Sequence, residues 1–283
     1  MKKILVATDF SVYADHALVS AISIAKQTKA QLIILHVINR PLNSEDDSYE
    51  GYHNMPGGGM VVTNIQKKLD AIVELHEIKD AKVVYELRYD VFRTIVKHAV
   101  LHDVEMIVMG AYGSNGMRES YIGSNTQRVM MQATMPVLVV KEKIEEFKID
   151  NLVFASEFYG EVYKVFPKMK RIIDLFCTKI HLLKVNTPNQ FQKTHESMKL
   201  MTEFSKEFGL EGSTKNIYND ISIEDGIINF TKQVNAELIA ITPDGFWRLT
   251  HIFNKNITDE LMKKSTKLIL SMKTHQPELL PSK

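Results

Sequence analysis

The stretch that decides the fold reads KILVATDF and spans Lys3–Phe10. Its apolar residues are continuous rather than alternating, which is typical of a strand buried on both faces of a parallel sheet. The polar residues Thr8, Asp9 and Ser11 follow, and residues of this kind can cap a helix. Alanine and aliphatic residues then recur at helical spacing over Ala14–Ala25. This opening therefore predicts a buried strand followed by an amphipathic helix.

The same alternation continues through the first half of the chain. Apolar runs predict further strands at 31–37, 82–87, 106–109 and 136–140. Helical patterns lie between them, near 61–79, 90–102 and 124–133. Residues 42–60 combine Pro, Ser and Asp with three consecutive glycines and predict a long mobile loop. Strands that alternate with helices in this way indicate an open parallel α/β sheet.

The pattern then restarts in the second half. The stretch NLVFASEF, at Asn151–Phe158, lies 148 residues after KILVATDF and has the same polarity at almost every position. At an offset of 132, Asp103–Met109 corresponds to Asn235–Ile241. We therefore predict two tandem α/β domains, 1–145 and 146–283, each with an open parallel sheet.

Composition excludes several classes of protein. The 283 residues are 45% hydrophobic and 24% charged, which is ordinary globular usage. A net charge of +1 gives no field that would attract nucleic acid or an anionic membrane, so we expect neither partner. No apolar run approaches a membrane span, the start of the chain lacks a signal-peptide pattern, and the single Cys177 excludes a disulfide framework. We expect a cytoplasmic protein, with Cys177 buried on a helix.

The residues with the most specific spacing are glycines. The stretch GAYG, at Gly110–Gly113, is followed after nine residues by Gly123 and Ser124. It lies after a predicted strand and before a predicted helix, where ligands bind in open α/β sheets. Glycines allow the backbone to approach a phosphate, and a helix N-terminus attracts anions. Ser124 and Gln127 also match a capping box, which needs no ligand. The residues alone leave both interpretations open.

This glycine spacing, with VATD at Val6–Asp9 and MPVLVV at Met135–Val140, resembles the universal stress protein family. The resemblance covers both halves. It implies that each half is a Rossmann-like, adenine nucleotide alpha hydrolase-like domain, a five-stranded parallel sheet with helices on both faces. It also implies ATP binding in members that carry the motif. The expected function is a stress-response protein that binds ATP, with or without Mg²⁺, as a ligand or switch. The alternative is a tandem scaffold that binds no nucleotide and acts as an interaction module.

The resemblance also implies a binding role for individual residues. Asp9 would contact the ribose or magnesium region of the nucleotide. Ala7 and Val37 would line the adenine slot, and Met109 and Gly110 would lie beside the ribose and first phosphate. The residues that would hold the phosphates are Gly113, Gly123, Ser124 and Asn125. We expect Gly123→Val to abolish binding, because its side chain would occupy the phosphate approach and resist a positive φ.

The second half departs from this motif. Thr242 stands where the first half has Gly110, and Lys255 and Asn256 stand where it has Gly123 and Ser124. Glu157 replaces Asp9. A β-carbon blocks the close backbone approach that glycine permits. The sequence therefore predicts one ATP per chain, in the first half.

Catalytic and metal signatures are weak. The chain has no P-loop and no G-x-S-x-G nucleophile elbow, so we expect no enzyme beyond, at most, a slow ATPase. His98 and His102 have a metal-compatible spacing, but no third ligand is near them in the sequence, and we expect no metal site.

The apolar edge candidates Pro136–Val140 and Leu268–Met272 predict that the two domains pair through their fifth strands as an internal pseudo-dimer. We also expect a homodimer of whole chains.

Overall fold

The computed structural model describes residues 1–39, 57–78, 80–88, 90–113, 123–144, 146–242 and 257–273. The first half contains β1 (Lys3–Ala7), α1 (Val12–Thr28), β2 (Gln31–Asn39), α3 (Gly58–Leu75), β3 (Lys82–Arg88), α4 (Val91–Leu101), β4 (Met106–Gly110), α5 (Ser124–Gln132) and β5 (Val137–Val140). The second half contains β6 (Ile149–Ala155), α6 (Val162–Phe176), β7 (Cys177–Asn186), α7 (Thr194–Glu207), β8 (Thr214–Asn219), α8 (Ile223–Gln233), β9 (Leu238–Ile241), α9 (Ile257–Lys264) and β10 (Leu268–Ser271).

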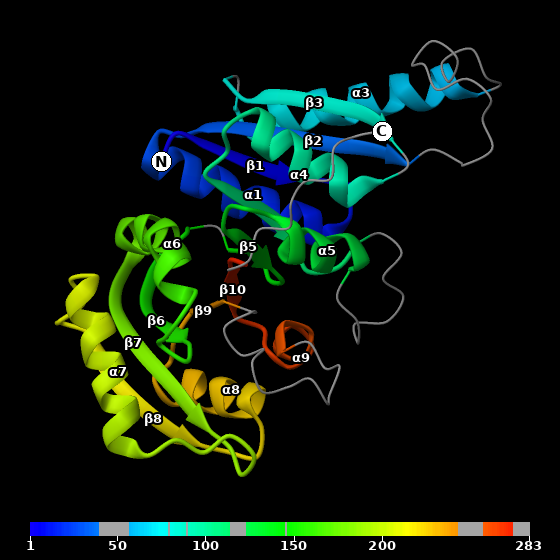
Figure 1. Cartoon of the computed structure of the whole chain (residues 1–283). Coiled ribbons are helices and arrows are strands. Elements are labelled where there is room, and N and C mark those ends of the chain that lie inside the picture. Colours follow the sequence, from blue (N-terminus) through cyan, green and yellow to red (C-terminus); the bar gives the residue numbers. More distant parts are fainter. Residues whose placement is uncertain are drawn as a thin grey trace.

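All the described strands belong to one ten-stranded sheet in the order β3-β2-β1-β4-β5-β10-β9-β6-β7-β8 (Figure 1). Each half supplies five parallel strands, as the apolar runs predict. β1 shows why: Ile4, Leu5 and Val6 are all fully buried, so both faces of the strand are covered. The predicted Rossmann-like α/β fold is confirmed.

The two halves meet at β5 and β10, which pair antiparallel. Leu138 faces Leu270, and these residues are 132 positions apart, the offset that relates the two halves. Val137 faces Ser271, so the register is symmetric about the central pair. This is the pairing that the sequence predicts for the fifth strands, and it leaves neither edge open. The division into domains 1–145 and 146–283 stays a prediction.

Two layers of helices cover the sheet (Figure 1). One core joins α1 and α3 of the first half to α6 and α7 of the second, through buried residues such as Ile24, Leu69, Phe166 and Phe204. The other core joins α4 and α5 to α8 and α9, through Ile95, Val129, Ile227 and Leu261. Both cores run continuously across the junction, so burial of apolar surface holds the halves together.

One predicted helix has shifted bounds, and one prediction of local structure is wrong. The expected helix at 61–79 begins earlier and ends earlier, since α3 starts at Gly58 and Gly57 precedes it with a left-handed φ of 85°. Residues 58–60 of the predicted loop are therefore helical, and residues 40–56 lie outside the described residues. Cys177 begins β7 rather than lying on a helix, and it is half-buried. Burial raises the pKa of its thiol to about 12.

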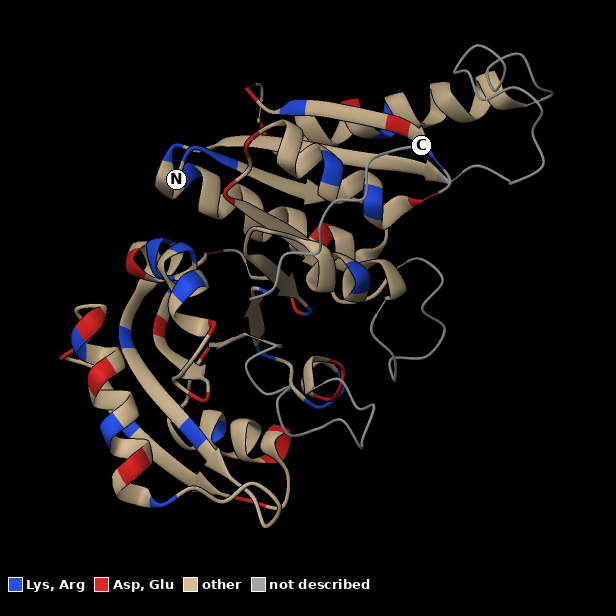
Figure 2. Cartoon of the chain, viewed as in Figure 1, with Lys and Arg blue, Asp and Glu red and all other residues tan. Residues whose placement is uncertain are grey.

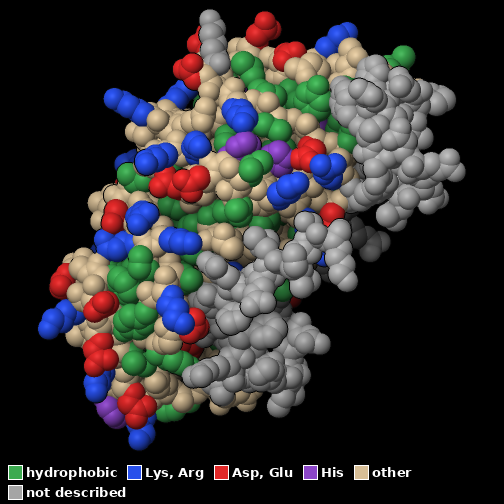
Figure 3. Space-filling model, turned by 45° about the horizontal axis from the view of Figure 1, so that its top comes forward, with side chains coloured by type: hydrophobic (Ala, Val, Ile, Leu, Met, Phe, Trp, Pro, Cys, Tyr) green, Lys and Arg blue, Asp and Glu red, His purple; other side chains and the backbone are tan. Residues whose placement is uncertain are grey.

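Charged side chains of both signs are interspersed over the described surface of both halves (Figures 2 and 3). Helix α7 illustrates this, since acidic and basic residues alternate along it in Figure 2. None of the helices in the described part of the chain is both long and apolar enough to cross a membrane.

Candidate functional site

The predicted site residues lie where β1, β2 and β4 end. Val6 pairs with Val108, and Ala7 pairs with Leu35, so β1 lies between β4 and β2. The order of strands reverses between β1 and β4, which makes this the topological switch point of the first half. In open parallel α/β sheets, ligands bind beyond the carboxyl ends of the strands at such a point.

Asp9, Gly113 and Gly123 come together at this point. A β-carbon on Gly113 would lie 3.0 Å from Asp9 Oδ2, and one on Gly123 would lie 3.4 Å from the backbone nitrogen of Gly113. The Gly123 N–H donates to the carbonyl of Ala111 at 2.9 Å, which ties the start of α5 to the end of β4. Asp9 is exposed, and its Oδ1 accepts from the Ser11 N–H at 3.1 Å. A carboxylate and two glycines thus share one small surface.

Gly110 has a packing role in addition to the one that the motif suggests. A β-carbon here would lie 2.6 Å from the backbone carbonyl carbon of Tyr13, in the first turn of α1, closer than real β-carbons come. Its own carbonyl accepts from Thr126 Oγ1 at 2.9 Å. Packing of α1 against β4 therefore requires glycine at this position. Any contribution of Gly110 to a ligand comes through its backbone.

The start of α5 corrects two expectations. Ser124 is the first helical residue, Gly123 precedes it, and no side chain caps the helix, so the capping-box interpretation is wrong. Gly123 has a φ of −58°, which any residue adopts, so the positive-φ argument against Gly123→Val is also wrong. The steric argument stays a prediction.

The N-terminal end of α5 is suited to bind an anion. The first backbone bond of the helix runs from the Gln127 N–H to the Gly123 carbonyl at 3.0 Å. The amides of Ser124, Asn125 and Thr126 precede it and have no partner within the helix. Ser124 is exposed and Asn125 is half-buried. These amides and the helix dipole together favour a negatively charged ligand.

The remaining predicted residues lie on the strands. Ala7 and Val37 are half-buried at the ends of β1 and β2. Met109 is only 5% exposed, and its side chain packs in the core shared with α4 and α5. The side chain of Met109 is thus part of the core, and only its backbone faces the strand end.

Three residues beside the site were missed by sequence reasoning. Phe10 has a positive φ of 62°, and its ring lies 4.5 Å from the ring of His36. His36 Nδ1 is 2.7 Å from the Thr8 carbonyl. Burial lowers the pKa of His36, while that carbonyl and the nearby Asp9 carboxylate act to raise it. Lys68 of α3 lies 5.0 Å from the centre of the Phe10 ring and brings a cation to the site. The recurrence of Phe10 as Phe158 was the available signal.

The second half repeats the backbone of this site, but its own side chains occupy the corresponding place. Phe158 has a φ of 58°, and its N–H donates to Ser156 Oγ, as Phe10 donates to Thr8 Oγ1. Glu157 stands in place of Asp9 and forms an ion pair with Lys184 of β7. Both are buried, at 8% and 3% exposure. An internal ion pair therefore occupies the place where the first half leaves an exposed carboxylate.

The other substituted positions of the second half are partly described. Thr242, the counterpart of Gly110, is fully buried, and its Oγ1 has no hydrogen-bond partner among the described residues. Lys255 and Asn256 lie outside the described residues.

The second half also has a cavity of about 640 Å³ beyond the ends of β7 and β8. Its lining residues are Asn186, Thr187, Pro188, Phe191, Asn219, Asp220 and Ile221.

The histidine pair does not form a metal site in the described structure. The rings of His98 and His102 are 5.7 Å apart, and His98 Nε2 bonds to the carboxylate of Glu86. Within the described ranges, no group of three or more potential metal ligands occurs. Burial is the largest single influence on the pKa of Glu86 and raises it. The hydrogen bond to His98 and the nearby Arg88 together lower it by more, so the pKa lies below its ordinary value.

Known proteins share this architecture. Residues 1–141 match the universal stress protein family. A universal stress protein of Methanocaldococcus jannaschii is 30% identical over 155 residues, which are 96% of that protein and 50% of this chain. Universal stress protein YxiE of Bacillus subtilis is 30% identical over 147 residues, which are 98% of that protein and 49% of this chain.

The likeness of folds extends over both halves. The crystal structure of a universal stress protein from Archaeoglobus fulgidus matches 96% of this chain and 96% of its own, with a TM-score of 0.66 and 16% identity. The curated relatives cover only about half of this chain, which agrees with two copies of one fold in tandem. The chain belongs to the universal stress protein family.

Proposed function

We propose that the first half binds ATP, with or without Mg²⁺, and that the nucleotide acts as a ligand or switch in a stress response. The observation that carries this proposal is the convergence of Asp9, Gly113 and Gly123 at the switch point of the sheet, directly before the uncapped end of α5. A carboxylate beside glycines and free amides suits a nucleotide, since amides can hold phosphates while the carboxylate accepts from a ribose hydroxyl or coordinates a cation.

The proposed contacts follow the geometry. The backbone of Gly113 and Gly123, with Ser124 and Asn125, would hold the phosphates. Asp9 would face the ribose or the magnesium ion. The adenine would lie against Ala7 and Val37, and Met109 and Gly110 would lie beside the ribose and the first phosphate.

Lys68 would add a positive charge to this site. Its ammonium lies 5.0 Å from the centre of the Phe10 ring, next to the Asp9 turn. A lysine held near a polyphosphate strengthens binding as a point charge, although it does not replace a backbone cradle. We therefore assign Lys68 a supporting role in phosphate affinity.

One nucleotide per chain is the proposed stoichiometry. The Glu157–Lys184 pair fills the corresponding place in the second half, and Thr242 carries a buried side chain where the first half has Gly110. Removing either partner of a buried pair leaves an unpaired charge, so a ligand would have to displace both. A cytoplasmic location, an internal pseudo-dimer that acts as one unit and a homodimer of whole chains remain predictions.

Calorimetric titration of the full chain with Mg-ATP tests the proposal, together with the 260 nm absorbance of the purified protein. We expect one site per chain, and Gly123→Val should remove it. Gly212→Val is the matched control, because a β-carbon at the exposed Gly212 meets nothing within 4 Å. Two sites per chain, or one site that survives Gly123→Val, would place the pocket elsewhere. No binding at all would favour the scaffold alternative.

A further inference from the structure

One hydrogen bond crosses from the second half to the helix that begins the proposed site. Gln127 Nε2 of α5 donates to Asp259 Oδ2 of α9 at 2.5 Å. Gln127 lies in the first turn of α5, three residues after Ser124. Asp259 lies 132 positions later in the chain, so the two residues are counterparts in the repeat. The contact is a polar equivalent of the Leu138–Leu270 pairing, formed where symmetry-related surfaces meet.

Asp259 depends on this bond. Its other oxygen, Oδ1, is buried without a hydrogen-bond partner among the described residues. Burial raises the pKa of Asp259, with Glu260 acting in the same direction, while Lys263 and the Gln127 hydrogen bond lower it. A partly buried carboxylate with one unsatisfied oxygen loses more than an exposed one when its donor is removed. The bond is therefore a specific contact between the two helices.

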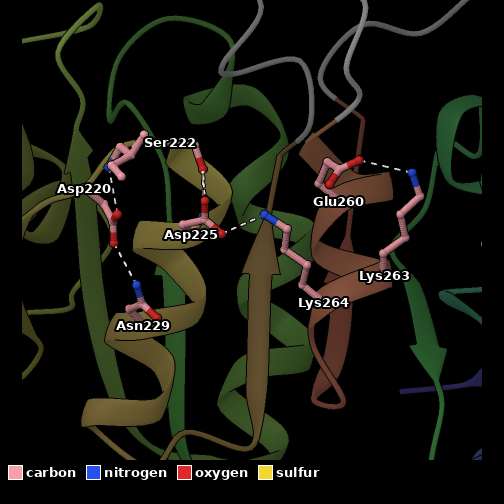
Figure 4. A network of polar contacts seen from close by, with 8 residues as sticks. Asp220, Ser222, Asp225, Asn229, Glu260, Lys263 and Lys264 are labelled. Carbon is pink, nitrogen blue, oxygen red and sulfur yellow. Dashed lines mark hydrogen bonds and ion pairs between the residues drawn. The ribbon is translucent and has the colours of Figure 1, made fainter. Parts of the chain in front are cut away.

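Contacts within the second half also hold helix α9 (Figure 4). Lys264 Nζ donates to Asp225 Oδ1 of α8 at 2.7 Å. Asp225 is itself fixed by the helix cap, since Ser222 Oγ donates to its Oδ2 and accepts from its N–H. Leu261 of α9 is fully buried in the core. The second half thus presents Asp259 from a helix anchored by an ion pair and by packing.

Helix α5 has no side-chain cap, a feature that it shares with α3, α4, α6 and α7. Ser11 caps α1 and Ser222 caps α8, each through a side chain that accepts a backbone N–H. Gly123 has no side chain to do this for α5. A first turn without a side-chain cap frays more readily than a capped one. Contacts outside the helix hold this turn instead: Gly123 and Thr126 bond to the end of β4, and Gln127 bonds to Asp259 of the second half.

We propose that Asp259 is a positioning residue, through which the second half holds the first turn of α5 in place for phosphate binding in the first half. The contacts described above support the positioning of α5 by Asp259. The effect on phosphate binding rests on the proposed function. Amides that are already ordered bind a phosphate without a further loss of entropy. The second half thereby has a part in nucleotide binding although its own site is filled.

The charge of Asp259 predicts the opposite effect on phosphate binding, and the experiment has to distinguish it from positioning. A carboxylate close to the start of α5 would also repel a phosphate, which would make Asp259 unfavourable for binding. Asp259→Asn removes the charge but keeps an oxygen that can accept from Gln127. Asp259→Ala removes both. Positioning predicts that only Asp259→Ala weakens binding, whereas repulsion predicts that both substitutions strengthen it.

The experiment measures two quantities in the full chain: the affinity for Mg-ATP by calorimetry, and the hydrogen exchange of the first-turn amides of α5 without nucleotide. We expect Asp259→Ala and Gln127→Ala each to weaken binding about threefold to tenfold, the range of one hydrogen bond. The double variant should be no weaker than either single one, because both break the same contact. Exchange in α5 should accelerate in Asp259→Ala and stay near wild type in Asp259→Asn.

Glu260→Ala is the matched control. It removes the neighbouring acidic residue from the same turn of α9, where Glu260 pairs with Lys263. Wild-type affinity and exchange in this variant would support the inference, whereas effects equal to those of Asp259→Ala would overturn it. Unchanged α5 exchange in Asp259→Ala, or tighter binding in both Asp259 variants, would also overturn it. If the wild-type chain binds no Mg-ATP, the proposed function fails, and the exchange measurement alone decides whether Asp259 holds α5.

Discussion

At the end of β1, Asp9 is exposed beside a half-buried His36, whereas at the end of β6 Glu157 and Lys184 are buried against each other. The backbone is the same in both places, down to the positive φ of Phe10 and Phe158. The repeat has therefore kept the turn while changing what occupies it. The same backbone turn serves in both halves. Its side chains determine whether the place is open to a ligand or occupied by an internal ion pair.

The contrast extends to the helices that cover the sites. In the first half, α1 packs so closely on β4 that only glycine fits at position 110. In the second half, the corresponding position holds the buried Thr242. Three substitutions break or sharpen this comparison.

The largest effect is expected from Glu157→Gln. The substitution leaves the buried ammonium of Lys184 without its counter-charge, which costs about 3–5 kcal/mol. Asp9→Asn makes the same chemical change at the exposed counterpart and should alter stability by less than about 0.5 kcal/mol. Urea unfolding of both variants measures the difference.

A second variant tests the cause of that loss. Lys184→Met added to Glu157→Gln removes both charges and should recover most of the stability, since a buried pair can be replaced by neutral groups of similar volume. Equal stabilities for Glu157→Gln and Asp9→Asn would show that the two sites do not differ in the way described above.

The next effect is expected from Gly110→Ala. Its β-carbon would lie 2.6 Å from backbone atoms of Tyr13, so α1 has to move away from β4 at a cost of about 1–3 kcal/mol. Gly212→Ala is the control, because the added carbon meets nothing there. Thermal or urea unfolding compares the two. A Gly110→Ala variant as stable as Gly212→Ala would show that packing against α1 does not require glycine at this position. Ligand binding would then be the remaining reason for it.

The smallest effect concerns pH. Burial lowers the pKa of His36, so the unfolded chain takes up this proton at a higher pH than the folded chain. The contribution of His36 to the free energy of unfolding is thus fully present above its ordinary pKa of 6.5, and is lost as the pH falls through its lower folded pKa. We expect His36→Gln to lose less stability than wild type between pH 7 and pH 5, as measured by urea unfolding. A steeper loss in the variant would contradict this.

Much of the fold could be predicted from the sequence. The apolar runs of the first half, and the restart of the pattern 148 residues after β1, predicted an open parallel sheet in each half. The apolar fifth strands predicted the pairing of β5 with β10. These features follow from local periodicity, which a single sequence carries directly. The start of α3 and the place of Cys177 were not predicted, because glycines and a helix that runs straight into a strand give no clear boundary.

The position of the candidate site also followed from the sequence, but its contacts did not. Spacing placed Gly113 and Gly123 beyond a strand end, yet only the folded chain shows the approach of Tyr13 to Gly110 and the pairing of Glu157 with Lys184. The bond between Gln127 and Asp259 belongs to the same group. Each of these contacts joins segments far apart in the chain. They depend on the distances between packed helices and strands, which residue order alone does not specify.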